Sequence, residues 1–118
     1  MLQIAHKKLE VYSISRELVK SIYFLTNGFP KEEQFLLVNQ LRRAAVSVCS
    51  NLAEGSSRIS KGDMKRFYEI SRGSLVEIDT QIEIAVDLGY INQEQISTIE
   101  PMLNSVFRML SKMIRNLS

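Results

Sequence analysis

Residues that constrain a fold or carry chemistry are scarce in this sequence. Its 118 residues include one cysteine, one histidine, five glycines, two prolines and no tryptophan. A single cysteine cannot form an internal disulfide, which is typical of a protein from a reducing compartment. No uncharged apolar run approaches the ~18 residues of a membrane span, and the N-terminus lacks the composition of a signal peptide. We therefore expect a soluble, cytoplasmic protein with no membrane contact.

The shortage of histidine and cysteine also limits enzymatic and metal chemistry. Di-metal bundles use inward glutamates and Glu-x-x-His pairs, but no acid lies three residues before His6, the only histidine. Cys49 has only that one imidazole available as a base, and the same shortage disfavours a Ser-His-Asp triad. The more common role for such a cysteine is a small buried residue in a helix contact. We expect no catalytic site, no metal site and no cofactor.

Apolar residues recur at helical spacing along almost the whole chain. Hydrophobic residues make up 45% and charged residues 24%, as in an ordinary globular protein, and the length suits one domain. Alternation of apolar and polar residues, which is typical of strands, is nearly absent. The spacing predicts four helices, which run roughly from Ala5 to Thr26, from Pro30 to Gly55 or Ser56, from Ser60 to Gly89, and from Asn92 to Leu117.

Capping and turn residues mark the ends of these segments. Asn27 and Gly28 tolerate the left-handed conformation that ends a helix, and Pro30 suits a first helical turn. Capping-box pairs begin the third and fourth segments, as Ser60 with Asp63 and Asn92 with Gln95. Pro101 lies inside the fourth segment, where it should remove one backbone hydrogen bond and kink or break the helix.

Each predicted segment carries an apolar stripe, and short loops join the segments. Neighbouring segments should therefore run antiparallel, which predicts an all-α, up-down-up-down four-helix bundle that forms a single domain over residues 1–118. The stripe of the second segment begins at Phe35. Ten apolar residues lie off the stripes: Leu37, Val46, Ile70, Val76, Ile84, Val86, Met102, Phe107, Met109 and Ile114. A monomer would leave several of them in water as a patch, which predicts a homo-oligomer.

Charge is distributed unevenly along the chain. Residues 40–75 contain seven basic and three acidic residues, whereas residues 76–118 contain three basic and six acidic residues. Attraction between neighbouring helices or subunits is the common reason for such segregation. The acidic row Asp79, Glu83 and Asp87, at steps of four, is more typical of a solvated face than of a cation site.

A basic strip is the strongest candidate for contact with nucleic acid. We define this basic strip as Arg58, Lys61, Lys65, Arg66 and Arg72. Helical spacing places most of it on neighbouring turns of the third segment, where it can bind phosphates, and Tyr68 beside it is suited to stacking on a base. Arg42 of the second segment is a sixth candidate. The alternative is a protein-interaction module whose basic strip docks an acidic partner.

Polar residues of the second and third segments should meet in the folded bundle. Antiparallel packing brings these stretches to a comparable height, and small residues let the backbones approach, with Gly73 providing a matching gap. We expect Glu77 to pair with Arg43 or Arg42. The predicted buried network contains six residues: Arg43, Asn51, Glu54, Ser74, Glu77 and Gln81. Because buried polar groups need partners, replacement of Glu77 should lower stability.

Several stretches resemble one known family closely, and together they cover nearly the whole chain. They are QLRRAAVSVCSNLAEG at 40–55, SSRIS at 56–60 and FYEISRGSLVEIDTQI at 67–82, with LEVYSISRELV at 9–19, FPKEE at 29–33 and DLGYI at 87–91. The sequence resembles the four helix bundle protein family, whose members are encoded in intervening sequences of bacterial large-subunit ribosomal RNA genes. Members often carry proline where this chain has Cys49, and cysteine does not force the kink that proline would impose.

The resemblance implies both an assembly and a class of function. Members are up-down-up-down bundles that assemble into a homopentameric barrel with a central channel. They are similar to the accessory variability proteins of diversity-generating retroelements, which bind a reverse transcriptase and nucleic acid through a basic surface. The intervening-sequence members have no established enzymatic activity. The resemblance therefore implies a non-catalytic scaffold or accessory protein that binds RNA or DNA, and a reverse transcriptase or ribosome-associated protein would be the acidic partner in the alternative.

Overall fold

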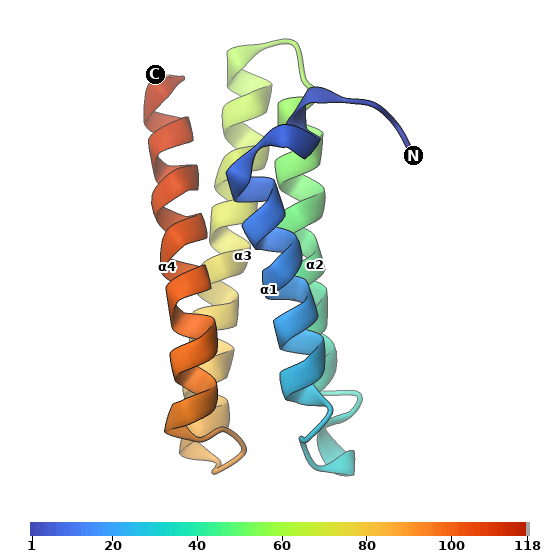
Figure 1. Cartoon of the computed structure of the whole chain (residues 1–118), viewed down its shortest axis with the longest axis vertical. Helices are drawn as coiled ribbons and strands as arrows, with labels where there is room; N and C mark the ends of the chain where they lie inside the picture. Colours follow the sequence, from blue (N-terminus) through green and yellow to red (C-terminus); the bar gives the residue numbers. More distant parts are fainter. Residues whose placement is uncertain (118) are drawn as a thin grey trace.

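Four antiparallel α-helices form the architecture of the computed structural model, which describes residues 1–117 (Figure 1). The helices are α1 (Glu10–Thr26), α2 (Leu37–Ser56), α3 (Lys61–Asp87) and α4 (Gln93–Asn116). Two short 3-10 helices accompany them, η1 (Ala5–Lys8) before α1 and η2 (Lys31–Glu33) between α1 and α2. The helices alternate in direction, so the N-terminus, the α2–α3 loop and the end of α4 lie at one end of the bundle. The predicted all-α, four-helix bundle is confirmed.

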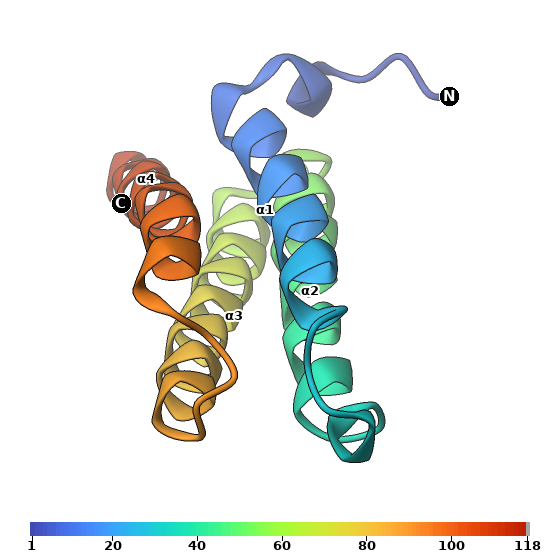
Figure 2. The ribbon, with the colours of Figure 1, turned by 60° about the horizontal axis from the view of Figure 1, so that its bottom comes forward.

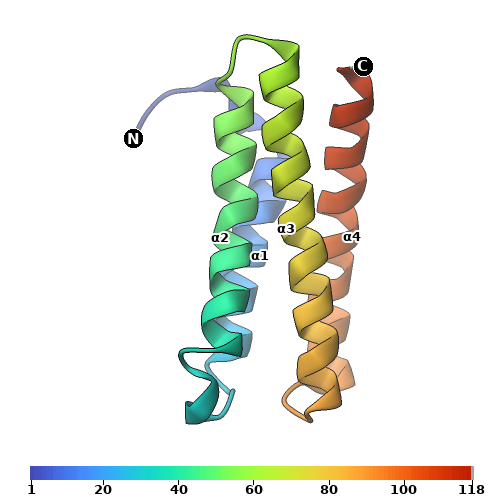
Figure 3. The same cartoon turned by 180° about the vertical axis from the view of Figure 1, so that it is seen from behind.

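Each helix packs against two neighbours. α1 contacts α2 and α4, and α3 contacts α2 and α4, whereas within residues 1–117 the two diagonal pairs of helices do not approach each other. An oblique view and the view from behind show the same arrangement (Figures 2 and 3). α2 and α3 form the closest pair of helices. The contact between α2 and α3 is therefore the most extensive helix contact of the bundle.

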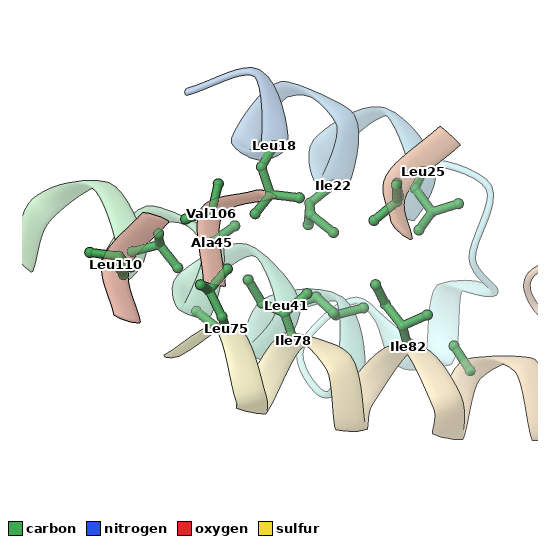
Figure 4. Close-up of a cluster of buried hydrophobic side chains, with 14 of the residues drawn as sticks. Leu18, Ile22, Leu25, Leu41, Ala45, Leu75, Ile78, Ile82, Val106 and Leu110 are labelled. Carbon is green, nitrogen blue, oxygen red and sulfur yellow. The ribbon is translucent and has the colours of Figure 1, made fainter. Parts of the chain in front are cut away.

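The core consists of aliphatic side chains that all four helices contribute (Figure 4). Leu18 of α1, Leu41 of α2, Ile78 of α3 and Leu110 of α4 are completely buried. Each lies on the apolar stripe predicted for its helix. Full burial of a side chain of this size stabilises the folded chain by about 1.5–3 kcal/mol. The stripes therefore supply the main driving force that brings the four helices together.

The start of α2 differs from the prediction. Pro30 precedes the short η2 turn, and α2 begins only at Leu37, after the backbone of Leu36 leaves the helical region at φ −116° and ψ −102°. Phe35, which we expected at the start of the buried stripe, is 88% exposed. A distant loop holds this link in place, because Tyr90 donates a hydrogen bond to the Glu33 carboxylate at 2.9 Å. The prediction used local signals alone and could not include this tertiary contact.

Both predicted caps are confirmed, while Pro101 leaves α4 unbroken. Ser60 Oγ accepts a hydrogen bond from the Asp63 backbone N–H, and Asn92 and Gln95 form the full reciprocal capping box. α4 continues through Pro101 to Asn116. Both Pro101 and Ser97 are exposed, so water can hydrate the Ser97 carbonyl that has lost its helical donor. α2 likewise runs as one helix through Cys49.

Most of the apolar residues predicted off the stripes face solvent. Six of the ten are exposed: Val46, Ile70, Val76, Ile84, Val86 and Phe107. Met102 and Met109 are half-buried, whereas Leu37 and Ile114 belong to the core, so these last two were assigned wrongly. Among residues 1–117, no helix is both long and apolar enough to cross a membrane.

Candidate nucleic-acid interface

The α2–α3 contact is close at Gly55, near the loop that joins the two helices. A Cβ atom at this position would lie only 2.8 Å from Cε1 of the Tyr68 ring and 3.0 Å from Cβ of Phe67. The Tyr68 ring is buried, and its hydroxyl shares a 2.9 Å hydrogen bond with Ser56. Two turns before Gly55 in α2, the Val48 carbonyl accepts a hydrogen bond from Ser71 Oγ at 2.7 Å. Small side chains therefore let the two backbones approach, as predicted for this stretch.

The close approach does not involve Gly73, which we had expected to supply the gap. Gly73 is exposed, and a Cβ atom there would meet no atom within 4 Å. Burial of Tyr68 also corrects a second expectation, because a ring that packs on Gly55 is not available to stack on a base. The tyrosine is a packing residue of the α2–α3 contact.

Arg42 faces α1 rather than α3. Its Nε donates to Thr26 Oγ1 at 2.9 Å, and its Nη2 donates to Asn27 Oδ1 at 3.0 Å and to the Tyr23 carbonyl at 3.4 Å. The guanidinium also lies 4.6 Å from the centroid of the Tyr23 ring. A cation at this position complements the negative end of α1 and satisfies its last carbonyl groups. The expected pairing of Arg42 with Glu77 is therefore wrong.

We expect Arg42→Ala to lower the free energy of unfolding by about 1–2 kcal/mol, since charge-assisted hydrogen bonds and a cation–π contact are lost together. Urea denaturation monitored by circular dichroism at a fixed protein concentration measures the change. The matched control is Arg43→Ala. It should change the free energy of unfolding by less than about 0.5 kcal/mol, because it replaces an exposed residue without such contacts. Equal losses in the two variants would show that Arg42 does not stabilise the end of α1.

The polar residues between α2 and α3 form a smaller network than predicted. Ser74 Oγ donates to Ser47 Oγ at 2.9 Å, and Asn51 Nδ2 donates to the Ser47 carbonyl and hydroxyl oxygens, both at 2.9 Å. Gln81 Nε2 makes a long 3.4 Å contact with Gln40 Oε1. Ser47 and Gln40, which were not in the predicted set, are thus the partners of the predicted residues. Ser47 and Gln40 could have been identified from the sequence, because helical spacing places them on the face of α2 that packs against α3.

Three charged residues of the predicted network behave differently from the expectation. Glu54 is exposed and pairs with Arg58 at 3.0 Å, so it is not part of a buried network. Arg43 and Glu77 line the same shallow pocket between α2 and α3, but no ion pair joins them in the part of the chain that the structure describes. Both side chains are exposed, so water can solvate them without a partner, and the structure gives no buried contact through which Glu77 would stabilise one protomer.

Two arginines of the basic strip lie beside an aromatic ring near the α2–α3 loop. The Arg58 guanidinium lies 4.7 Å from the centroid of the Phe67 ring, and that of Arg66 lies 5.8 Å from it. Lys61 is exposed in the first turn of α3, and Ile59 at the loop tip is fully exposed. Phe67 and Ile59 were not singled out from the sequence. The adjacent aromatic pair Phe67–Tyr68 could have identified Phe67 in the sequence. In the structure the tyrosine is buried, and the phenylalanine lies beside the arginines.

The remaining members of the strip lie on the side of α3 toward α4. Arg72 donates to Ser111 Oγ at 3.1 Å, and its guanidinium lies 5.7 Å from the centroid of the Phe107 ring. Lys65 is half-buried and lies two turns nearer the N-terminus of α3 than Arg72. Three arginines of the strip thus lie beside aromatic rings. The structure places the basic strip over the α2–α3 loop and the N-terminal half of α3, with Arg58 and Arg66 at Phe67 and Arg72 toward α4.

Cys49 is held in an unreactive form. Burial raises the pKa of the Cys49 thiol to about 11, with Arg16 acting weakly in the opposite direction. The thiolate is the nucleophile, so a raised pKa leaves the sulfur protonated and inert at neutral pH. No group of three metal-binding side chains is present within the described residues. The side chain of His6 lies outside that described part.

Comparison with known proteins gives one family and one fold. The family model described as 23S rRNA-intervening sequence protein matches residues 7–112. A crystal structure from Bacteroides thetaiotaomicron, of a protein with unknown function from the S23 ribosomal protein family, superposes with a TM-score of 0.78. The two chains are 24% identical over 88% of this chain and 97% of the other, a likeness that shows the shared fold. No curated protein matches the sequence.

Proposed function

Because the chain belongs to the 23S rRNA-intervening sequence protein family, we propose that it is a non-catalytic, homo-oligomeric accessory protein whose basic strip binds nucleic acid. The observation that carries this proposal is the position of Arg58 and Arg66 beside the Phe67 ring, with the exposed Lys61 in the first turn of α3 near the same loop. The guanidinium groups suit bidentate contact with phosphates, and the ring offers a flat apolar surface beside them. The compartment that fits such a partner is the cytoplasm.

Assembly would strengthen this weak binding surface. One protomer presents only a few cations, and each phosphate contact releases counterions that add modestly to affinity. A ring of identical protomers would repeat the basic strip around its rim, so that later contacts form at high effective concentration. A pentamer, as the family resemblance implies, would present five copies of the strip to one nucleic-acid chain.

The outer face of α3 supports an oligomer. Ile70, Gly73, Glu77 and Ile84 follow each other at steps of three, four and seven, so they form one row along the helix. All four are exposed in the protomer. A glycine inside an exposed helix costs about 1 kcal/mol relative to alanine, and a helix of a second protomer that approaches closely at Gly73 would give that cost a structural reason.

Nucleic-acid binding is tested by filter binding to a structured RNA and a duplex DNA across a salt series. We expect binding at low salt that weakens steeply as salt rises, and we expect Lys61→Glu/Lys65→Glu to reduce affinity at least about tenfold and flatten the salt dependence. Lys61 is exposed and Lys65 is half-buried, and no described ion pair involves either, so the variant should fold normally, which circular dichroism verifies.

The matched control reverses two lysines away from the basic strip, Lys20→Glu and Lys31→Glu, which lie in α1 and η2. This control makes the same change in net charge and should keep most of the affinity. Absence of binding by the unmodified protein at low salt would remove the nucleic-acid function, and a protein partner would then be the remaining role for the strip. Equal losses in both variants would show that net charge, rather than the strip, attracts the nucleic acid.

A further inference from the structure

We propose that a groove between α3 and α4 binds a cationic, amphipathic helical segment of a basic partner protein. The groove has a volume of about 370 Å³ and lies where the C-terminal half of α3 meets the first turns of α4. This position is at the end of the bundle opposite the α2–α3 loop (Figure 1). The groove is thus separate from the basic strip, and its occupant has the opposite charge.

The floor of the groove is apolar. Ile82 and Ile99 face each other from α3 and α4, Leu25 closes the inner side from the end of α1, and Leu103 extends the floor along α4. Ile82, Ile99 and Leu25 are nearly buried, so the floor is a firm part of the core. An apolar floor favours a ligand that carries aliphatic surface, which a hydrated inorganic ion lacks.

The rim of the groove is acidic. It carries four carboxylates, from Asp79, Glu83, Asp87 and Glu100, and no lysine or arginine lines the groove. No described ion pair involves any of these four residues. The carboxylates do not converge, since no three metal-binding side chains gather in the described residues. Charges that are spread along a groove fit several separate cations better than one metal ion.

The position of two of these acids is unfavourable for the helix that carries them. Asp87 ends α3 and Glu83 lies one turn before it, and the last turn of the helix contains no basic residue. Carboxylates near the negative end of a helix dipole destabilise the helix by a few tenths of a kcal/mol, and a nearby cation reverses the effect. A cationic ligand would therefore stabilise α3 as well as neutralise the rim.

The spacing of the rim identifies the geometry of the occupant. Asp79, Glu83 and Asp87 follow at steps of four, which places them about 6 Å apart along the helix axis. Lysines or arginines at steps of four on a partner helix have the same separation. Their aliphatic stems can pack on Ile82 and Ile99 while the charged heads reach the carboxylates. Leucines on the same face would add apolar contact with the floor.

The test uses fluorescence anisotropy with a fluorescein-labelled model peptide that has lysines at steps of four and leucines between them on one helical face. We expect saturable binding that weakens with salt. Asp79→Asn/Glu83→Gln should weaken it at least about tenfold, since the loss of charged partners across an interface costs affinity strongly. The matched control Glu10→Gln/Glu69→Gln removes two exposed acids that do not line the groove and should change affinity less than about twofold.

A second peptide of the same charge, with serine in place of leucine, tests the apolar floor and should bind more weakly than the first. Equal binding of the two peptides, or equal losses in the groove and control variants, would overturn the proposal in favour of general attraction to negative charge. The Asp79→Asn/Glu83→Gln variant should retain any nucleic-acid binding of the basic strip. This readout separates a failure at the groove from a failure of the proposed function at the other end.

Discussion

Gly55→Ala is expected to lower the free energy of unfolding by about 1–3 kcal/mol, although alanine is the better helix former. The added methyl group would lie 2.8 Å from the Tyr68 ring, well inside van der Waals contact. The ring cannot move away easily, because it is buried and its hydroxyl is bonded to Ser56. α2 and α3 must therefore separate slightly, which weakens the closest contact of the bundle. Chemical denaturation at a fixed protein concentration measures the loss.

The control for this prediction is Gly62→Ala. Gly62 lies in the first turn of α3, and a Cβ atom there would meet nothing within 4 Å. We expect this variant to keep or raise stability, by up to about 1 kcal/mol from helix propensity. If Gly55→Ala were as stable as Gly62→Ala, the α2–α3 contact would be loose enough to accept a larger residue. The close approach would then not be a constraint on the sequence.

The double variant Ile70→Asp/Ile84→Asp is expected to dissociate the proposed homo-oligomer into folded single chains. Both isoleucines are just over two-fifths exposed in the protomer, on one row of α3 with Gly73 between them. Two carboxylates buried without partners in an interface cost several kcal/mol each. Most interfaces dissociate when they lose this much free energy of association. Light scattering coupled to gel filtration measures the mass, and circular dichroism measures the helix content, which should not change.

The matched control places two aspartates at other exposed apolar positions, Phe35→Asp and Ile59→Asp. These side chains are 88% and 101% exposed and lie in the α1–α2 link and at the tip of the α2–α3 loop. The control should keep the mass of the unmodified protein. A monomeric mass for the unmodified protein at micromolar concentration would contradict the proposed oligomer directly. Dissociation by both variants would place the interface elsewhere than the row on α3.

The features that the sequence predicts well depend on neighbours along the chain. Helix caps such as Ser60 with Asp63 need residues only three positions apart, and the apolar stripes need only the period of the helix. Leu41 and Ile78 are completely buried as their stripes require. Four helices with short links then leave few ways to bury the stripes, so the antiparallel bundle follows.

The features that the sequence predicts poorly depend on which neighbour a helix face meets. Arg42 and Arg43 are adjacent but point about 100° apart on α2, so one reaches the end of α1 and the other faces solvent beside α3. Gly55, rather than Gly73, is at the close contact for the same reason. The acidic groove combines residues of α1, α3 and α4, and only the row on α3 was visible in the sequence.

The location of both chain ends has a practical consequence for experiments. The N-terminus and the end of α4 lie at the same end of the bundle as the α2–α3 loop (Figure 1). An affinity tag or fluorescent domain fused to either terminus would crowd the basic strip and weaken its contact with large polyanions. Molecules immobilised on a sensor chip through either terminus would present the acidic groove outward. Attachment through the α3–α4 turn reverses this orientation. Binding experiments on the basic strip and on the acidic groove therefore need different attachment sites.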